Sequence, residues 1–164
     1  MTITYSSPVT ITSTWKNIAT SSTFVAGAEC SQIDNSSLKY EDAILQGNLS
    51  VGTTPTAGTR IILWGWGAQQ SLATTAIDVL DGTDSVETLT NTGVLASFKP
   101  LATITVLATT SDIAYPIVCP SVCLRMGWRV LPPFWGLFMS HNTGVNLRNT
   151  SVNDNSLAYI GITT

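Results

Sequence analysis

Short runs of β-branched and aromatic residues recur along the whole chain, and helical periodicity is nearly absent. Each run is bounded by Gly, Pro, Asn, Asp or Ser, which is the pattern of strands joined by turns. The runs that we predict as strands are 23–33, 38–51, 60–67, 101–108, 115–124, 134–141 and 157–163. Seven or eight strands in 164 residues predict an all-β fold, an antiparallel β-sandwich.

The two ends of this pattern differ in character. Residues 1–20 are rich in Thr and interrupted by Pro8, so they predict either an extended N-terminal arm lying on a neighbouring molecule or a first strand. Residues 21–164 hold no linker or repeat and are expected to form one sandwich domain. Within them, 68–100 is weakly patterned and predicts a short helix or a peripheral hairpin. Turns are expected at 140–144 and 153–155.

Charge is scarce in this chain, and its distribution argues against two classes of partner. Charged residues make up 10% of the sequence, the net charge is −3, and the seven basic residues are scattered. Nucleic-acid binding needs a basic patch, so no nucleic-acid partner is expected. No run reaches the roughly 18 apolar residues of a spanning helix, and residues 1–8 do not resemble a secretory signal. We therefore expect no membrane association and synthesis in the cytoplasm.

The polar residues do not form a recognisable catalytic set. The sequence holds one histidine, His141, which is expected to be a turn or surface residue, and no nucleophile motif accompanies it. We therefore predict a protein that is not an enzyme and uses no cofactor.

Metal binding is also not indicated. The acidic residues Asp78, Asp81, Asp84 and Glu87 are close in sequence but do not fit the EF-hand spacing, so a solvated turn is the expectation. The three cysteines, Cys30, Cys119 and Cys123, lack the spacing of a zinc site and are interpreted as buried free thiols.

Two strands are apolar on both faces. In 60–67, Trp64 and Trp66 alternate with glycines, so both indoles point to one side and the other side is open to close packing. Such a pair could stack on a sugar, but the preceding apolar run favours core or subunit-interface packing. Because 134–139 is also apolar on both faces, we interpret one face as buried against another subunit. The interface candidates are Trp64, Trp66, Phe134, Trp135, Phe138, Pro8, Ile11 and Trp15.

The order of several segments resembles that of a viral family. These are the Trp-Gly-Trp-Gly strand (64–67), Leu-Ala-Thr-Ile-Thr-Val (101–106), Leu-Pro-Pro-Phe-Trp-Gly-Leu (131–137), Asn-Thr-Gly (142–144) and Leu-Ala-Tyr-Ile-Gly-Ile (157–162). Together they resemble small tailed-bacteriophage virion proteins, most closely the jelly-roll capsid decoration, or cement, proteins. The stretch 126–129 has no counterpart in that resemblance.

The resemblance implies a jelly-roll-like sandwich that binds the outer capsid surface as a homotrimer and stabilises the shell. Its partners would then be further copies of itself and the major capsid protein, and its location would be the virion, after synthesis in the bacterial host cytoplasm. The alternative is a phage tail or fibre-tip module that binds a cell-surface carbohydrate through Trp64 and Trp66 or another aromatic patch.

Overall fold

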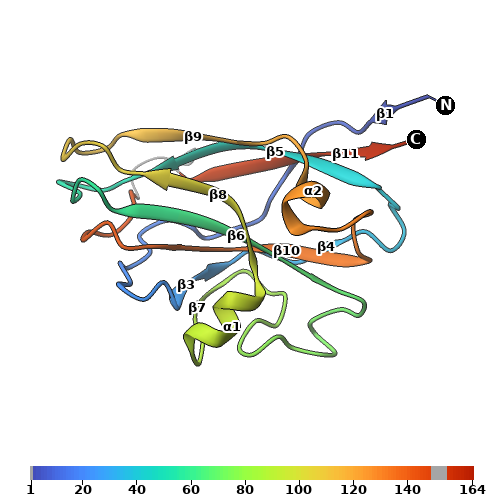
Figure 1. The fold of residues 1–164 in the computed structure, drawn as a ribbon, viewed down its shortest axis with the longest axis horizontal. Helices are drawn as coiled ribbons and strands as arrows, with labels where there is room; N and C mark the ends of the chain where they lie inside the picture. The colour runs from blue at the N-terminus through green and yellow to red at the C-terminus, as the bar shows by residue number, and fades with distance from the viewer. Residues whose placement is uncertain (1, 149–154) are drawn as a thin grey trace.

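A computed structural model describes residues 2–148 and 155–164 of the chain, of which 43% lie in strands and 7% in helices. Two antiparallel sheets pack face to face and form two layers, seen edge-on in Figure 1. The strands are β1 (Thr4–Tyr5), β2 (Val9–Thr10), β3 (Ala26–Glu29), β4 (Ile33–Asp34), β5 (Asp42–Ser50), β6 (Arg60–Ala68), β7 (Ser85–Thr88), β8 (Lys99–Thr105), β9 (Ala114–Cys119), β10 (Phe134–His141) and β11 (Ser156–Thr163). The helices are α1 (Thr92–Ser97) and α2 (Val122–Met126).

The strand order is that of a jelly roll. The five-stranded sheet runs β1-β11-β5-β9, with β2 also paired to β11, and the six-stranded sheet runs β7-β3-β10-β6-β8, with β4 paired to β10. If β1 and β2 are counted as one strand and the short β4 and β7 are left out, eight strands remain. Renumbered from 1 to 8 along the chain, they have the order 1-8-3-6 in the first sheet and 2-7-4-5 in the second. Consecutive strands therefore tend to lie in opposite sheets, and the all-β sandwich prediction is confirmed.

The core lies between the two sheets and includes residues from the N-terminal segment. Its largest fully buried members include Trp15, Trp135 and Leu45. Ile11 and Ile18 are also buried in this cluster, with 5% and 2% of their surface exposed. The strands β1 and β2 pair with β11. Residues 2–20 therefore supply strands and core side chains to this domain, instead of forming an arm that lies on a neighbour.

A second apolar cluster covers the outer face of the six-stranded sheet. Residues 69–98, which connect β6 to β8 and contain β7 and α1, fold over that face (Figure 1). We call them the cover segment. The buried side chains of this cluster are Trp66, Leu72, Leu80, Leu89, Leu95, Phe98 and Phe138. The sequence predicted a helix or a hairpin here, and the segment contains a short helix and a strand at the sheet edge.

Gly65 and Gly67, two residues apart in β6, leave room for α2 and the loop after it. A Cβ at Gly67 would lie 1.8 Å from the ring of Trp128, and one at Gly65 would lie 2.9 Å from Leu101 and Met126. The glycines thus permit the close approach that their spacing predicted. Helix α2 was not predicted: strand 115–124 ends at Cys119, and Ser121 instead caps the helix by accepting a hydrogen bond from Leu124 N.

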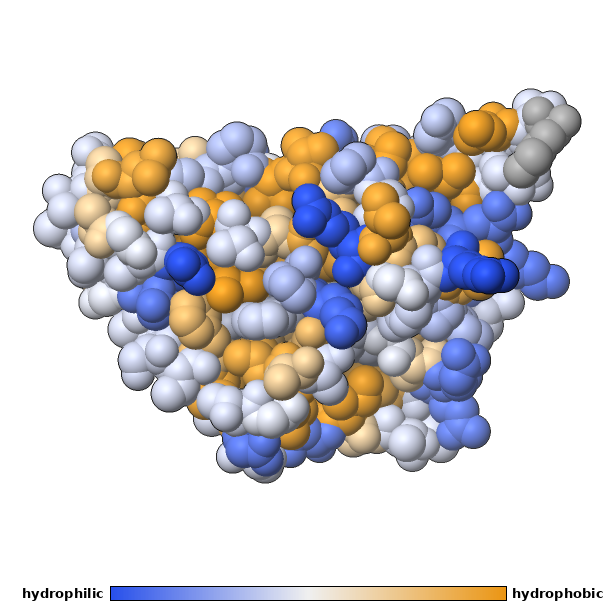
Figure 2. All heavy atoms as spheres, viewed as in Figure 1, coloured by the Kyte–Doolittle hydropathy of each residue, from blue (hydrophilic) through white to orange (hydrophobic). Residues whose placement is uncertain are grey.

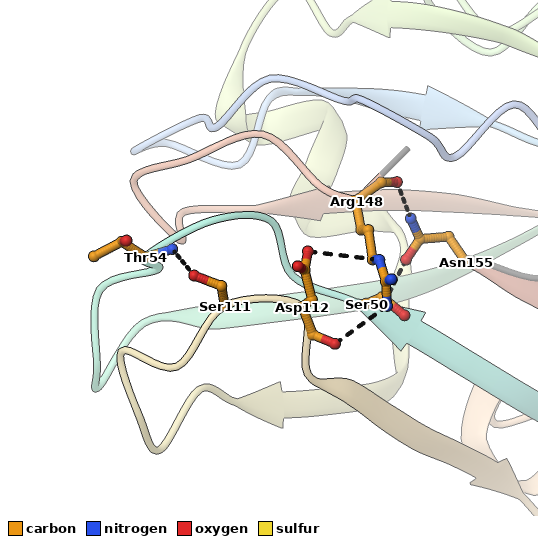
Figure 3. A network of polar contacts seen from close by, with 6 residues as sticks. All are labelled: Ser50, Thr54, Ser111, Asp112, Arg148 and Asn155. Atoms are coloured by element: carbon orange, nitrogen blue, oxygen red, sulfur yellow. Dashed lines mark hydrogen bonds and ion pairs between the residues drawn. The ribbon is translucent and has the colours of Figure 1, made fainter. Parts of the chain in front are cut away.

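At one end of the sandwich, polar contacts hold the loops together (Figure 3). Arg148 Nε lies 3.5 Å from Asp112 Oδ1, and Asn155 donates from Nδ2 to the Arg148 carbonyl and accepts from Ser50 N. Thr54 N donates to Ser111 Oγ nearby. These groups bind one another across four loops and strands, so their role is structural. The turn predicted at 153–155 lies, except for Asn155, outside the described residues.

Candidate functional site

The single histidine is a buried strand residue, and not the turn or surface residue expected from the sequence. His141 is the last residue of β10 and is fully buried. Its Nε2 donates to the Ile18 carbonyl at 2.9 Å, and its Nδ1 lies 3.0 Å from Oγ1 of Thr143. Burial lowers the pKa of the ring below its ordinary value. Both nitrogens are thus occupied by the chain's own groups.

The acidic residues on the cover segment serve different backbone groups. Asp78 accepts from Thr90 N, Asp81 from Thr83 N, and Asp84 from both N and Oγ1 of Thr14. Across residues 2–148 and 155–164, no three His, Cys, Asp or Glu side chains are placed to hold one metal ion. Asp81 therefore stabilises a turn, as its sequence neighbours predicted. Asp84 instead joins the cover segment to the N-terminal segment, and Asp78 bonds a residue 12 positions away.

Glu29 is the exception among the acids because it is completely buried. It lies on β3 beneath the cover segment, where Oε1 accepts from Asp81 N at 3.1 Å and Oε2 has no hydrogen-bond partner among the described groups. Burial raises its pKa to about 7. The sequence did not single out this residue, since a glutamate in an alternating strand ordinarily faces solvent.

The three cysteines are buried free thiols, as predicted. Burial raises the pKa of Cys30 and of Cys123 to about 12. A thiol with so high a pKa holds almost no thiolate at neutral pH, so Cys30 and Cys123 are not activated nucleophiles. Burial raises the pKa of Cys119 as well.

The aromatic interface candidates are mostly covered by the chain itself. Trp66 and Phe138 lie under the cover segment, with 2% and 0% of their surface exposed, and Trp135 lies fully buried between the sheets. Trp64 and Phe134 are partly buried, and Trp64 Nε1 donates to Ser140 Oγ. The second apolar face of these strands is thus buried within the chain, and the inference that another subunit must cover it is wrong.

The remaining candidates come from the N-terminal segment, where Ile11 and Trp15 are core residues and Pro8 is exposed. The burial of Trp66 also removes Trp64 and Trp66 as an open pair on which a sugar could stack. No helix among the described residues is both long and apolar enough to span a bilayer.

A surface that the sequence analysis missed is the outer face of the five-stranded sheet. The register places Gln46 beside Val118 on β9 and beside Ala158 on β11, and Ala158 pairs in turn with Thr10. These residues surround a hollow of about 510 Å³ whose lining contains no charged residue. Period-2 alternation in 42–50 and 114–119 carried the signal, because the outward positions that line the hollow hold the amides Gln46 and Asn48 together with Pro116 and Val118.

This face, with its uncharged mixture of Gln, Asn, Thr, Val, Ala and Pro, has the composition of a protein-contact surface more than of a catalytic site. Strands β1 and β2 lie on one side of β11, and β5 and β9 lie on the other, so the face is broad and continuous. Comparison with protein-family models, with curated proteins and with solved structures finds no match for this chain.

Proposed function

We propose that this protein is a virion structural protein, a capsid decoration protein that binds the outer capsid surface as a homotrimer and stabilises the shell. The observation that carries the proposal is the uncharged hollow on the outer face of the five-stranded sheet of this jelly roll. Its partner on that face is the major capsid protein. The mechanism is mechanical, since each bound copy raises the free energy needed to separate adjacent capsid subunits.

Two features support a contact role for this face. Burying the hollow costs little, because its lining carries no charge that must lose its hydration. It also exposes apolar groups: Val118 has 67% of its surface exposed and the neighbouring Pro116 is exposed too. The alternative, a tail or fibre-tip module that binds a sugar, lacks its predicted platform because Trp66 is buried.

The proposal is tested first by composition. Mass spectrometry of purified particles from the source of this sequence should find the chain at a fixed ratio to the major capsid protein. Particles that lack the chain altogether would overturn the proposal, and a few copies per particle would favour a tail location.

The docking face is tested by co-sedimentation with undecorated particles. The double variant V118K/A158K places two charges on the face and is expected to lose binding. The matched control L107K/T109K adds the same charge in the exposed loop after β8. Equal binding by V118K/A158K and the wild type would show that this face is not the contact, and a glycan array tests the sugar alternative directly.

A further inference from the structure

The six-stranded sheet has two unpaired edges of opposite charge. Strand β7 forms one edge, with Asp84 just before it and Glu87 within it. Strand β8 forms the other edge, begins at Lys99 and is packed against α2, which carries Arg125. Acidic and basic side chains of the same molecule therefore lie at opposite ends of one sheet.

These charges are not neutralised within the chain. Between the residues that the structure describes, the one ion pair joins Arg148 to Asp112, at the loop end of the sandwich. Lys99 and Arg125 thus have no carboxylate within 4.0 Å in the described part of the chain, and Glu87 has no cation. Complementary charges that the monomer leaves unpaired can pair between two copies.

Both edges also expose apolar side chains. On β7, Val86 stands between the acidic residues with 65% of its surface exposed. Beside α2 lies a groove of about 480 Å³, lined by Pro100, Pro120, Ser121, Leu124 and Arg125. Leu124 is 79% exposed. Figure 2 looks onto this side of the molecule, where hydrophobic residues lie among separated hydrophilic ones around α2.

The β8 edge is poorly suited to pairing through the main chain. Pro100 lies in β8 and Pro116 in the neighbouring edge strand β9, and neither has a backbone N–H to donate. Proline is a common means of preventing one sheet from extending into another. We therefore expect a contact at this edge to use side chains, and Leu124 and Arg125 of α2 are exposed beside it.

We propose that two copies of this chain associate head to tail, with the β7 edge of one copy seated in the groove beside α2 of the next. Val86 then meets Pro100 and Leu124, and Glu87 meets Arg125. Such a contact joins two different patches, as every cyclic trimer requires. The inference deepens the proposed function by giving its homotrimer an interface, and association is measured in solution without particles, so the two can fail separately.

The test is sedimentation velocity over a concentration series at low and high salt. The wild type is expected to associate, and more weakly at high salt because the paired charges are near the surface. The variants L124E/R125E and V86K/E87K each alter one edge and are expected to lose at least about tenfold in affinity. L38E/K39E is the matched control, because it replaces an exposed leucine and the adjacent lysine in the turn before β5. Circular dichroism and thermal melting show whether each variant is folded. If a double variant does not fold, the single variant R125E or E87K replaces it.

Mixing the two edge variants tests the head-to-tail arrangement itself. The L124E/R125E copy retains its acidic β7 edge and the V86K/E87K copy retains its groove, so a mixture should associate although neither variant does so alone. A wild type that stays monomeric at every concentration would overturn the proposal. So would edge variants that associate like the control, or a mixture that stays monomeric while the wild type associates.

Discussion

The indole ring of Trp66 occupies the space that a side chain at position 136 would need. The two residues are direct partners across β6 and β10, and a Cβ built on Gly136 would lie 2.3 Å from Cζ2 of Trp66. The ring lies flat against the neighbouring strand because that strand has a glycine there. Trp66 in turn forms part of the apolar cluster beneath the cover segment, so Gly136 sets how closely that segment packs.

Replacing Gly136 by Ala should therefore destabilise the fold. The added methyl group must displace the indole from a packed cluster, and overpacking of this kind costs about 1–3 kcal/mol. Urea unfolding followed by tryptophan fluorescence measures the loss. The control A114V enlarges an exposed residue at the start of β9 and should unfold near the wild-type midpoint. If G136A shared that midpoint, Trp66 would not be held as tightly as the structure indicates.

The N-terminal segment should be essential for stability. Trp15 is fully buried in the main cluster, so W15A is expected to lower the free energy of unfolding by about 3–5 kcal/mol. The control Y5A removes a ring that is 59% exposed, and it should change the free energy of unfolding by less than about 0.5 kcal/mol. Deleting residues 1–20 should abolish cooperative melting, since Ile11, Trp15 and Ile18 leave together. A truncated chain that melts at the wild-type temperature would restore the arm interpretation.

Strand positions could be predicted from the sequence because the β-branched and aromatic composition of a run, and the turn residues that bound it, are local properties. Runs 60–67 and 134–141 match β6 and β10 to within a residue. The same runs showed correctly that both of their faces are buried. What they could not show is which residues cover the second face, because Leu72, Leu80 and Leu89 reach Trp66 by folding back from a segment with no regular spacing.

Burial of His141 could not be predicted for a related reason. Turn residues follow it at Asn142 and Gly144, and by local rules it belongs with them. In the structure its Nε2 meets the carbonyl of Ile18, which is distant in sequence but adjacent in space. The uncharged sheet face, by contrast, was readable from the outward positions of its strands, but only once their pairing was known.

His141 should contribute to stability despite having no catalytic partner. H141A leaves the Ile18 carbonyl without its donor and creates a cavity, so we expect a loss of about 1–3 kcal/mol at pH 7. Because burial lowers its pKa, the folded protein binds this proton less readily than the unfolded chain. The histidine's contribution is therefore present above pH 6.5 and lost as the pH falls below it.

Urea unfolding of wild type and H141A at pH 7 and at pH 5.5 measures both effects. The difference in free energy between the two proteins should shrink at the lower pH. An H141A protein as stable as the wild type at pH 7 would mean that the histidine is not held by Ile18.

Glu29 should make the fold less stable as the pH rises. Burial raises its pKa from 4.5 to about 7, and the nearby Asp81 carboxylate adds repulsion. The folded protein therefore binds this proton more tightly than the unfolded chain. The resulting stability is complete below pH 4.5 and is lost as the pH rises through 7, a change of up to about 3 kcal/mol.

The substitution Glu29→Gln should remove this pH dependence. A glutamine side-chain oxygen can still accept from Asp81 N, which Glu29 Oε1 does in the native chain, but it carries no charge at any pH. E29Q is thus expected to be more stable than the wild type at pH 8 by a larger margin than at pH 5. His141 is present in both proteins, so its contribution to stability, which changes with pH in the opposite direction, cancels when the two are compared at the same pH. An unchanged margin between pH 5 and pH 8, measured by urea unfolding, would show that Glu29 is ionised in the folded protein over that whole range and that solvent reaches it beneath the cover segment.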